Sequence, residues 1–143
     1  MALGWSNTRT AFRDRWNRLR PLDRHRLANA VRAYRGYSRN KRGIATAQSA
    51  WPMSLSVEPT TSCNLRCPEC PSGLRSFTRP TGMLEVDTLK RVLDEIGHHL
   101  VYLNLYFQGE PYLHSEMNEL VRIGVAHGLY TSTSTNAHFL RPE

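Results

Sequence analysis

The sequence predicts an α/β fold in which parallel strands alternate with helices. Three stretches have the composition of strands, and the two stretches between them carry apolar residues at helical spacing. An alternation of strand, helix, strand, helix and strand is typical of parallel strands joined by right-handed crossovers. A chain of 143 residues with 40% hydrophobic residues is long enough to bury the core of one such domain.

Residue types predict the three strands. Residues 53–58 (M-S-L-S-V-E) alternate apolar and polar side chains. Residues 100–107 (L-V-Y-L-N-L-Y-F) are mostly apolar and aromatic, and residues 130–135 (Y-T-S-T-S-T) are rich in β-branched side chains. We therefore expect one strand in each of these ranges.

The two connections are predicted to be helical. The first helix is expected over about residues 86–98, where apolar residues recur at helical spacing, at Val86, Leu89, Leu93 and Ile96. The second is expected from Ser115, a possible N-cap, to about His127, with Gly128 just past its end. Its inward residues are predicted to be Met117, Leu120, Val121 and Val125.

The first fifty residues differ from the rest in charge. Residues 1–50 carry 12 Lys and Arg against two Asp, whereas residues 51–143 carry 7 Lys and Arg against 10 Asp and Glu. Helical patterns run from about Thr8 to Leu19 and from about Leu22 to Tyr37. The second pattern has a narrow apolar stripe, formed by Leu22, Leu27, Ala30, Val31 and Tyr34. We expect two parts: a basic helical extension (1–50) and an α/β domain (51–143).

The basic extension suits several partners. It could pack on the domain as a helical hairpin, or attract an acidic partner, nucleic acid or an anionic membrane surface. Its aromatic residues Trp5, Phe12, Trp16 and Tyr34 suit any of these. The sequence has no apolar run of the roughly 18–20 residues that a transmembrane segment needs, and we expect a cytoplasmic protein with few, reduced cysteines.

Three cysteines form the most specific pattern. Residues 63–70 read C-N-L-R-C-P-E-C, and Cys63, Cys67 and Cys70 are the only cysteines of the chain. Disulfides use cysteines in pairs, and a closed zinc site would need a fourth ligand. The histidines that could supply one are His98, His99, His114 and His127. An iron–sulfur cluster fits better, because thiolates are its usual ligands and three of them leave one iron free.

The stretch E-P-T-T-S-C-N-L-R-C-P-E-C-P resembles the signature loop of radical S-adenosyl-L-methionine (SAM) enzymes, especially members with a C-terminal SPASM-type domain. The resemblance covers about residues 53–140. It implies the first three β/α units of a partial (β/α)6 TIM-like barrel, and a 4Fe–4S cluster held by Cys63, Cys67 and Cys70. In that family SAM binds the open iron and is reductively cleaved to a deoxyadenosyl radical, which abstracts hydrogen from the substrate.

Two further loops agree with the resemblance. Gly109, Glu110 and Pro111 look like the family's G-G-E-P motif, which contacts the SAM amino group, with Gln108 in place of the first glycine. Thr135 and Asn136 resemble the family's T-N-G, with Ala137 in place of glycine. All these residues are expected at the carboxyl ends of the strands, on one face.

One position departs from the family. An aromatic residue commonly precedes the third cysteine and packs near adenine, whereas this chain has Glu69. We expect another side chain, such as Phe77 or Tyr106, to make that contact.

Three strands are half of the six in the family's barrel, so the chain is expected to be an N-terminal fragment of the core domain. The expected partners are an electron donor and an unknown substrate, a peptide or a small metabolite. The alternative is a non-enzymatic adaptor that binds zinc through its cysteines and nucleic acid or a membrane through its basic N-terminal arm.

Overall fold

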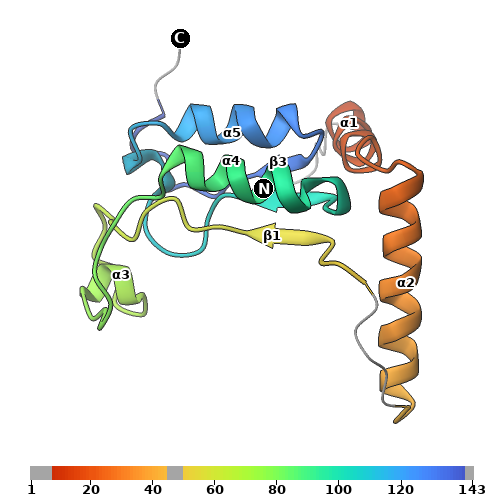
Figure 1. Ribbon diagram of the computed structural model, residues 1–143. Coiled ribbons are helices and arrows are strands. Elements are labelled where there is room, and N and C mark those ends of the chain that lie inside the picture. The colour runs from red at the N-terminus through yellow and green to blue at the C-terminus, as the bar shows by residue number, and fades with distance from the viewer. Residues whose placement is uncertain (1–7, 45–49, 141–143) are drawn as a thin grey trace, which may run out of the picture.

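The computed structural model describes residues 8–44 and 50–140 and shows an α/β domain with two N-terminal helices beside it (Figure 1). Its three short strands are parallel and lie in chain order: β1 (Ser54–Ser56), β2 (Tyr102–Asn104) and β3 (Tyr130–Ser132). Leu103 in the middle strand lies opposite Leu55 on one side and Thr131 on the other. The predicted alternation and the parallel pairing are confirmed.

Two helices cover one face of this sheet, α4 (Val86–Ile96) and α5 (Met117–Ala126) (Figure 1). The core between the helices and the sheet is formed by nine buried side chains, Leu89, Leu93, Leu100, Leu103, Leu105, Met117, Leu120, Ile123 and Leu129. Most are leucines from the predicted apolar positions, so the periodicity of the sequence located the core.

The strands are shorter than their predicted ranges. Pairing extends slightly past β2 at both ends, since Val101 N–H donates to Met53 O at 2.8 Å and Leu105 N–H donates to Ser132 O at 2.8 Å. The chain then leaves the sheet: Leu105 is fully buried, whereas Phe107 is 73% exposed. The apolar run therefore overstated the strand because its last residues belong to a loop.

The helix boundaries also differ. α4 ends at Ile96 and tightens into a 3-10 turn, η1 (Gly97–His99), so the α-helix stops slightly before the predicted end near His98. α5 begins at Met117 with Glu116 at the N-cap position, not Ser115. The chain reaches α5 from a second 3-10 turn, which ends at Leu113.

Val125 is 60% exposed, so its predicted inward position was also wrong. The reason lies at Gly124, which approaches the sheet closely. A Cβ atom there would lie 2.5 Å from Thr131 Oγ1 and 2.7 Å from Leu103 Cδ2. Gly124 and Ile123 therefore face the sheet, and Val125 turns toward solvent.

The N-terminal helices are α1 (Thr8–Leu19), as predicted, and α2 (Arg24–Lys41), which starts and ends later than predicted. Asp23 sets the start of α2, because its carboxylate accepts hydrogen bonds from the N–H groups of His25 and Arg26 at 2.8 and 2.9 Å. Trp5 lies outside the described residues.

The predicted apolar stripe of α2 does not pack on the domain. Leu27, Val31 and Tyr34 are exposed, and the buried residues of this helix are Arg26 and Asn29. The side of α2 that faces the domain is instead held by the hydrogen bonds of Arg26 and Asn29.

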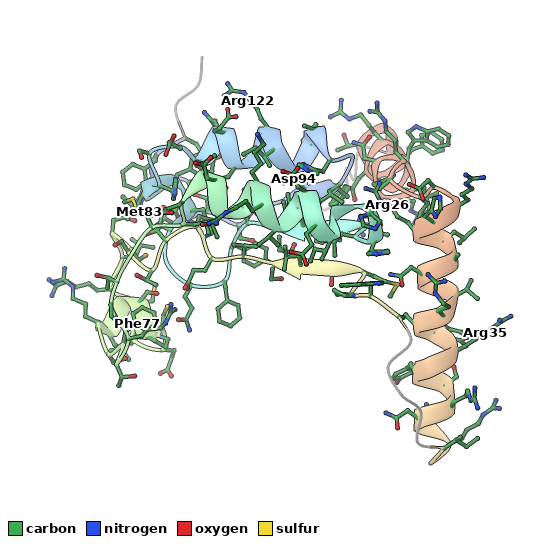
Figure 2. The ribbon with its side chains drawn as sticks, in the orientation of Figure 1. Arg26, Arg35, Phe77, Met83, Asp94 and Arg122 are labelled. Carbon is green, nitrogen blue, oxygen red and sulfur yellow. The ribbon has the colours of Figure 1, made fainter. Side chains whose placement is uncertain are left out.

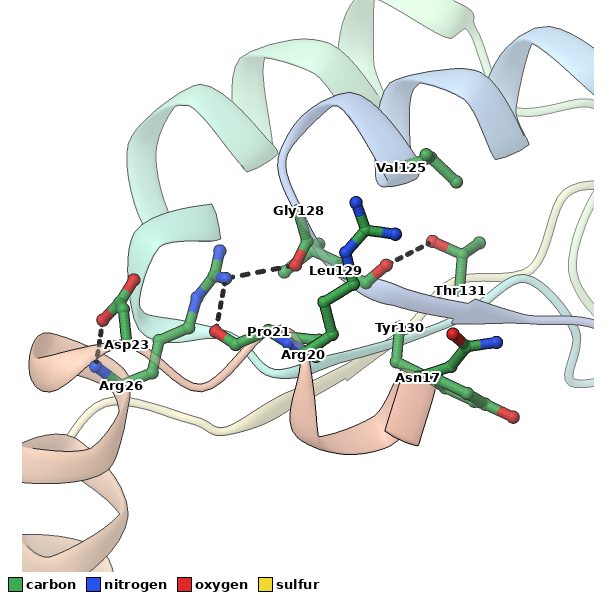
Figure 3. A pocket seen from close by; sticks show the side chains of 10 residues that line it. All are labelled: Asn17, Arg20, Pro21, Asp23, Arg26, Val125, Gly128, Leu129, Tyr130 and Thr131. Atoms are coloured by element: carbon green, nitrogen blue, oxygen red, sulfur yellow. Dashed lines mark hydrogen bonds between the residues drawn. The ribbon is translucent and has the colours of Figure 1, made fainter. Parts of the chain in front are cut away.

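Arg26 is the main anchor of α2 (Figure 3). Its guanidinium donates to four main-chain carbonyls, those of Pro21 (2.8 Å), Gly97 (3.1 Å), His127 (2.8 Å) and Gly128 (3.1 Å). Gly97 and His127 are the C-cap residues of α4 and α5, so a single cation binds main-chain carbonyls at the C-terminal ends of both core helices.

Further polar contacts hold the two helices. Asn29 exchanges two hydrogen bonds of 3.0 Å with the main chain of Trp51. Tyr130 donates its hydroxyl to Asp14 of α1 at 2.6 Å, and the Arg18 guanidinium lies over the Tyr130 ring. Both helices thus attach where the strands begin.

Within the described residues, no helix combines the length and the apolar character needed to cross a membrane.

Candidate functional site

The loops that follow the three strands meet at one end of the sheet, as the sequence predicts. Glu110 N–H, in the loop after β2, donates to Ser62 O in the cysteine loop at 2.8 Å. Asn136, in the loop after β3, donates its side-chain amide to Asn64 Oδ1 at 2.8 Å. Asn64 also contacts the ring of His138 at 2.9 Å.

Glu110 lies at the centre of this arrangement and is 1% exposed. Its Oε1 atom accepts hydrogen bonds from Thr135 Oγ1 at 2.6 Å and from Tyr112 N–H at 3.0 Å. Its Oε2 atom accepts from Asn136 N–H at 2.7 Å. The carboxylate therefore ties the second loop to the third, and its buried charge is compensated by three donors.

The neighbours of Glu110 fix its position. Gly109 has a φ of +78°, and a Cβ atom there would lie 2.2 Å from Thr60 O and 2.8 Å from Ser62 O. Only glycine allows the second loop to approach the cysteine loop this closely. Pro111 is buried and begins a 3-10 turn, η2 (Pro111–Leu113).

The three cysteines lie on a loop that ends in a short helix, α3 (Pro71–Leu74) (Figure 1). All three are free thiols; Cys67 is exposed, and Cys63 and Cys70 are half-buried. The loop folds back on itself, since Cys70 N–H donates to Cys67 O at 3.3 Å. A Cβ atom on Gly73 would lie 2.5 Å from Cys67 N, so the loop also needs a glycine there.

Main-chain amides favour the thiolate form of Cys70. The N–H groups of Gly73 and then Ser72 lower the pKa of the Cys70 thiol from its ordinary value, against a smaller opposing effect of burial. A thiolate is the form that binds metal ions and clusters. The donor chemistry of this loop therefore suits a cluster.

The thiols are not gathered around a common point. Among the described residues, no three His, Cys, Asp or Glu side chains form a group that could hold a metal ion. Cys63 Sγ instead accepts a hydrogen bond from Leu65 N–H at 3.5 Å.

The turn after β3 contains Ala137, at the position where the family's T-N-G motif has glycine. Ala137 has a φ of +66°, the left-handed conformation in which glycine is preferred. Its N–H donates to Thr135 Oγ1 at 3.1 Å, and His138 N–H donates to Asn136 Oδ1 at 3.1 Å. These local bonds hold alanine in a conformation that costs it free energy.

A hollow of about 300 Å³ lies beside the cysteine loop. Its lining combines hydroxyl groups, two arginines, a cysteine and a phenyl ring, from Thr61, Ser62, Cys63, Ser72, Arg75, Phe77, Arg79 and Thr81. Phe77 is half-buried under the Arg79 guanidinium, 4.7 Å from the ring centre, and Figure 2 shows it at the α3 end of the molecule. Glu69 is exposed, and Tyr106 is not part of this lining.

The structure adds two residues that the sequence did not single out. Ser72 Oγ accepts the N–H of Gly109 at 2.9 Å and so joins the α3 end of the cysteine loop to the second loop. Asn64 joins the same loop to the third. Both are short polar residues near turns, a common pattern that carries little information without spatial neighbours.

The fold and these loops define an α/β protein whose polar residues converge at the carboxyl ends of parallel strands. No family model matches the chain. Several curated proteins are similar to it, and three of them represent the set. PqqA peptide cyclase of Rhodopseudomonas palustris is 35% identical over 104 residues, 72% of this chain and 27% of the relative. AdoMet-dependent heme synthase of Methanosarcina barkeri is 32% identical over 92 residues, 64% of this chain and 26% of the relative.

Mycofactocin maturase MftC of Mycobacterium tuberculosis is 34% identical over 92 residues, 64% of this chain and 23% of the relative. These relatives are radical SAM enzymes, and the chain is therefore related to the radical SAM superfamily, as its cysteine loop indicates. The chain spans about a quarter of the length of these relatives.

A solved structure shares the fold. BtrN, crystallised in complex with AdoMet and 2-DOIA, superposes with a TM-score of 0.54 at 24% identity, over 63% of this chain and 38% of that chain.

Proposed function

We propose that residues 51–143 are the N-terminal half of a radical SAM core domain, with β1 to β3 as the first strands of a partial (β/α)6 barrel. The observation that carries the proposal is the convergence on Glu110. The buried carboxylate of Glu110 ties together the loops that follow β2 and β3, and the main-chain N–H of Glu110 donates to Ser62 O in the cysteine loop. Such convergence is the arrangement in which α/β folds place their ligands.

Cys63, Cys67 and Cys70 would hold the 4Fe–4S cluster. The loop supplies free thiols, and the amides beside Cys70 favour its thiolate. When bound, the cluster would supply the electron for reductive cleavage of SAM to a deoxyadenosyl radical, which abstracts hydrogen from the substrate. Free thiols are kept in reducing compartments, so we propose a cytoplasmic location. A separate electron donor would reduce the cluster.

Gly109, Glu110, Pro111, Thr135 and Asn136 would line the SAM site. A carboxylate has about four acceptor positions, and Glu110 uses three of them on main-chain and hydroxyl donors. The remaining position and the negative charge suit the ammonium group of SAM. Thr135 and Asn136 hold the carboxylate in place for that contact.

The substrate would lie against the face of the sheet that α4 and α5 leave uncovered. Polar side chains run across this face: Asn104 donates to Ser56 at 3.2 Å, Ser132 donates to Asn104 at 2.7 Å, and Tyr102 contacts Ser132 at 3.0 Å. A peptide or a small polar metabolite could form hydrogen bonds to such a row. A peptide also agrees with the name of one relative, PqqA peptide cyclase.

Anaerobic reconstitution with iron and sulfide tests the proposal. The unsubstituted chain should gain the visible absorbance of an iron–sulfur cluster, and Cys67→Ser should lose it. Addition of dithionite and SAM should then yield deoxyadenosine. Colourless protein with one tightly bound zinc would instead favour the adaptor, and a loaded cluster without deoxyadenosine would show that these 143 residues bind the cluster without the activity.

A further inference from the structure

α1 exposes its large apolar side chains. Phe12, Trp16 and Leu19 are 71%, 62% and 58% exposed. Spacings of four and then three residues place all three on one side of the helix. They form a continuous apolar stripe that nothing in the described residues covers.

α2 repeats the same pattern. Leu27, Val31 and Tyr34 follow each other at the same spacings of four and three, and they are 54%, 41% and 70% exposed. We call the six residues Phe12, Trp16, Leu19, Leu27, Val31 and Tyr34 the outer stripes.

The inner faces of both helices are polar. α1 meets the domain through Asp14 and Arg18, which contact Tyr130, and α2 meets it through the buried Arg26 and Asn29. A surface helix normally buries its apolar side and exposes its polar side. In α1 and α2 the polar side faces the domain and the apolar side is exposed. Burial of the outer stripes therefore contributes nothing to the stability of the described chain.

The charges of this segment complement an anionic surface. Between residues 10 and 44, every Lys and Arg except Arg26 is exposed. The two acidic residues of the same range are engaged: Asp14 binds Tyr130 and Arg18, and Asp23 caps α2. The outer surface therefore combines apolar stripes with cations and has no carboxylate free of a partner.

The two helices can contact one plane together. In Figure 1, α1 is seen along its axis and α2 lengthwise, and both lie at the end of the molecule away from α3. The α/β domain lies on one side of both helices, and Arg35 points away from that domain in Figure 2. A flat surface along the outer side would touch both helices and leave the cysteine loop facing away.

We propose that α1 and α2 bind the surface of an anionic phospholipid bilayer, with the outer stripes inserted among the lipids and the arginines on the headgroups. Basic helices with Trp, Phe and Leu on one face bind bilayer interfaces in this way. Nucleic acid is disfavoured as the partner because Leu19, Leu27 and Val31 would gain little from a phosphate backbone. The proposal does not depend on the cluster or on SAM.

Vesicle sedimentation of the 143-residue chain tests the proposal. The chain should bind phosphatidylcholine vesicles containing phosphatidylglycerol at least tenfold more tightly than pure phosphatidylcholine vesicles, and binding should fall as salt rises. The charge-reversed variant Arg35→Glu should bind more than about fivefold more weakly, since each basic residue near an anionic surface contributes about fivefold and the variant also adds a negative charge. Equal binding to both kinds of vesicle would overturn the proposal.

A second variant separates insertion from charge attraction. Trp16→Ser with Leu27→Ser keeps every charge and should weaken vesicle binding about tenfold, whereas its binding to heparin should be unchanged. Val92→Ser, an exposed aliphatic position on α4, is the matched control and should bind vesicles normally. Circular dichroism checks that each variant is folded. Undiminished vesicle binding by the double variant, or binding of the unsubstituted chain to heparin but not to vesicles, would overturn the proposal.

Discussion

The hydroxyl of Thr135 donates a 2.6 Å hydrogen bond to the buried carboxylate of Glu110, and this contact joins the loops that follow β2 and β3. The two residues are 25 positions apart in the sequence. A buried carboxylate is tolerated only where donors compensate its charge, so each residue depends on the other.

Replacement of Glu110 by glutamine should destabilise the domain. The side-chain NH2 of Gln would face the N–H of either Tyr112 or Asn136, which can only donate, and would leave a buried donor unsatisfied. We expect Glu110→Gln to lower the free energy of unfolding by about 1–3 kcal/mol, measured by urea denaturation. The exposed Glu116→Gln should change it little, and equal stability of both variants would contradict the role given to Glu110.

Replacement of Gly109 by alanine should displace the cysteine loop. The new Cβ atom would overlap with Thr60 O, and alanine is strained at a φ of +78°. We expect a loss of at least ~2 kcal/mol in unfolding free energy and a smaller iron content after reconstitution. Gly82→Ala, where a Cβ atom meets nothing within 4 Å, should retain the iron content. A Gly109→Ala chain that loads iron normally would show that the close approach is not needed.

Ala137 offers a substitution in the opposite direction. Because its φ is +66°, glycine should relieve strain at this position and stabilise the chain by about 1 kcal/mol. Ala126→Gly, at the last residue of α5, should destabilise it, since glycine costs helix stability. The two midpoints of thermal unfolding should thus move in opposite directions, and a fall for Ala137→Gly would refute the account of this turn.

The apolar pattern of the sequence located the parallel strands, the two covering helices and most of the leucine core, because burial of leucine follows helix and strand periodicity. It also placed Glu110, Thr135 and Asn136 at one end of the sheet, because parallel strands end on the same side. The sequence could not show that these three residues bond to each other, since such bonds depend on loop conformation.

The inward face of α2 was missed for a different reason. Arg26 and Asn29 are buried because main-chain groups of distant segments bind the terminal nitrogens of the Arg26 guanidinium and the side-chain amide of Asn29. Sequence patterns count an arginine as exposed, and only the position of its partners shows otherwise.

Replacement of Arg26 by methionine should release α2 from the domain. The aliphatic stem would be kept, but four carbonyl groups would lose their donor. We expect a loss of about 3 kcal/mol in unfolding free energy and faster proteolysis between residues 20 and 44. Arg24→Met, at an exposed position of the same helix, is the control and should behave like the unsubstituted chain. Equal protease resistance of the two variants would contradict the anchoring role of Arg26.

The central claim is that Cys63, Cys67 and Cys70 hold a 4Fe–4S cluster whose fourth iron is open to SAM. Mössbauer spectroscopy of the chain reconstituted with iron-57 tests it most directly, because three thiolates for four irons leave one iron distinguishable. Addition of SAM should change the isomer shift of about one quarter of the iron absorption and leave the remainder unchanged. A spectrum that SAM leaves unaltered, or the same spectrum from Cys67→Ser, would contradict the claim.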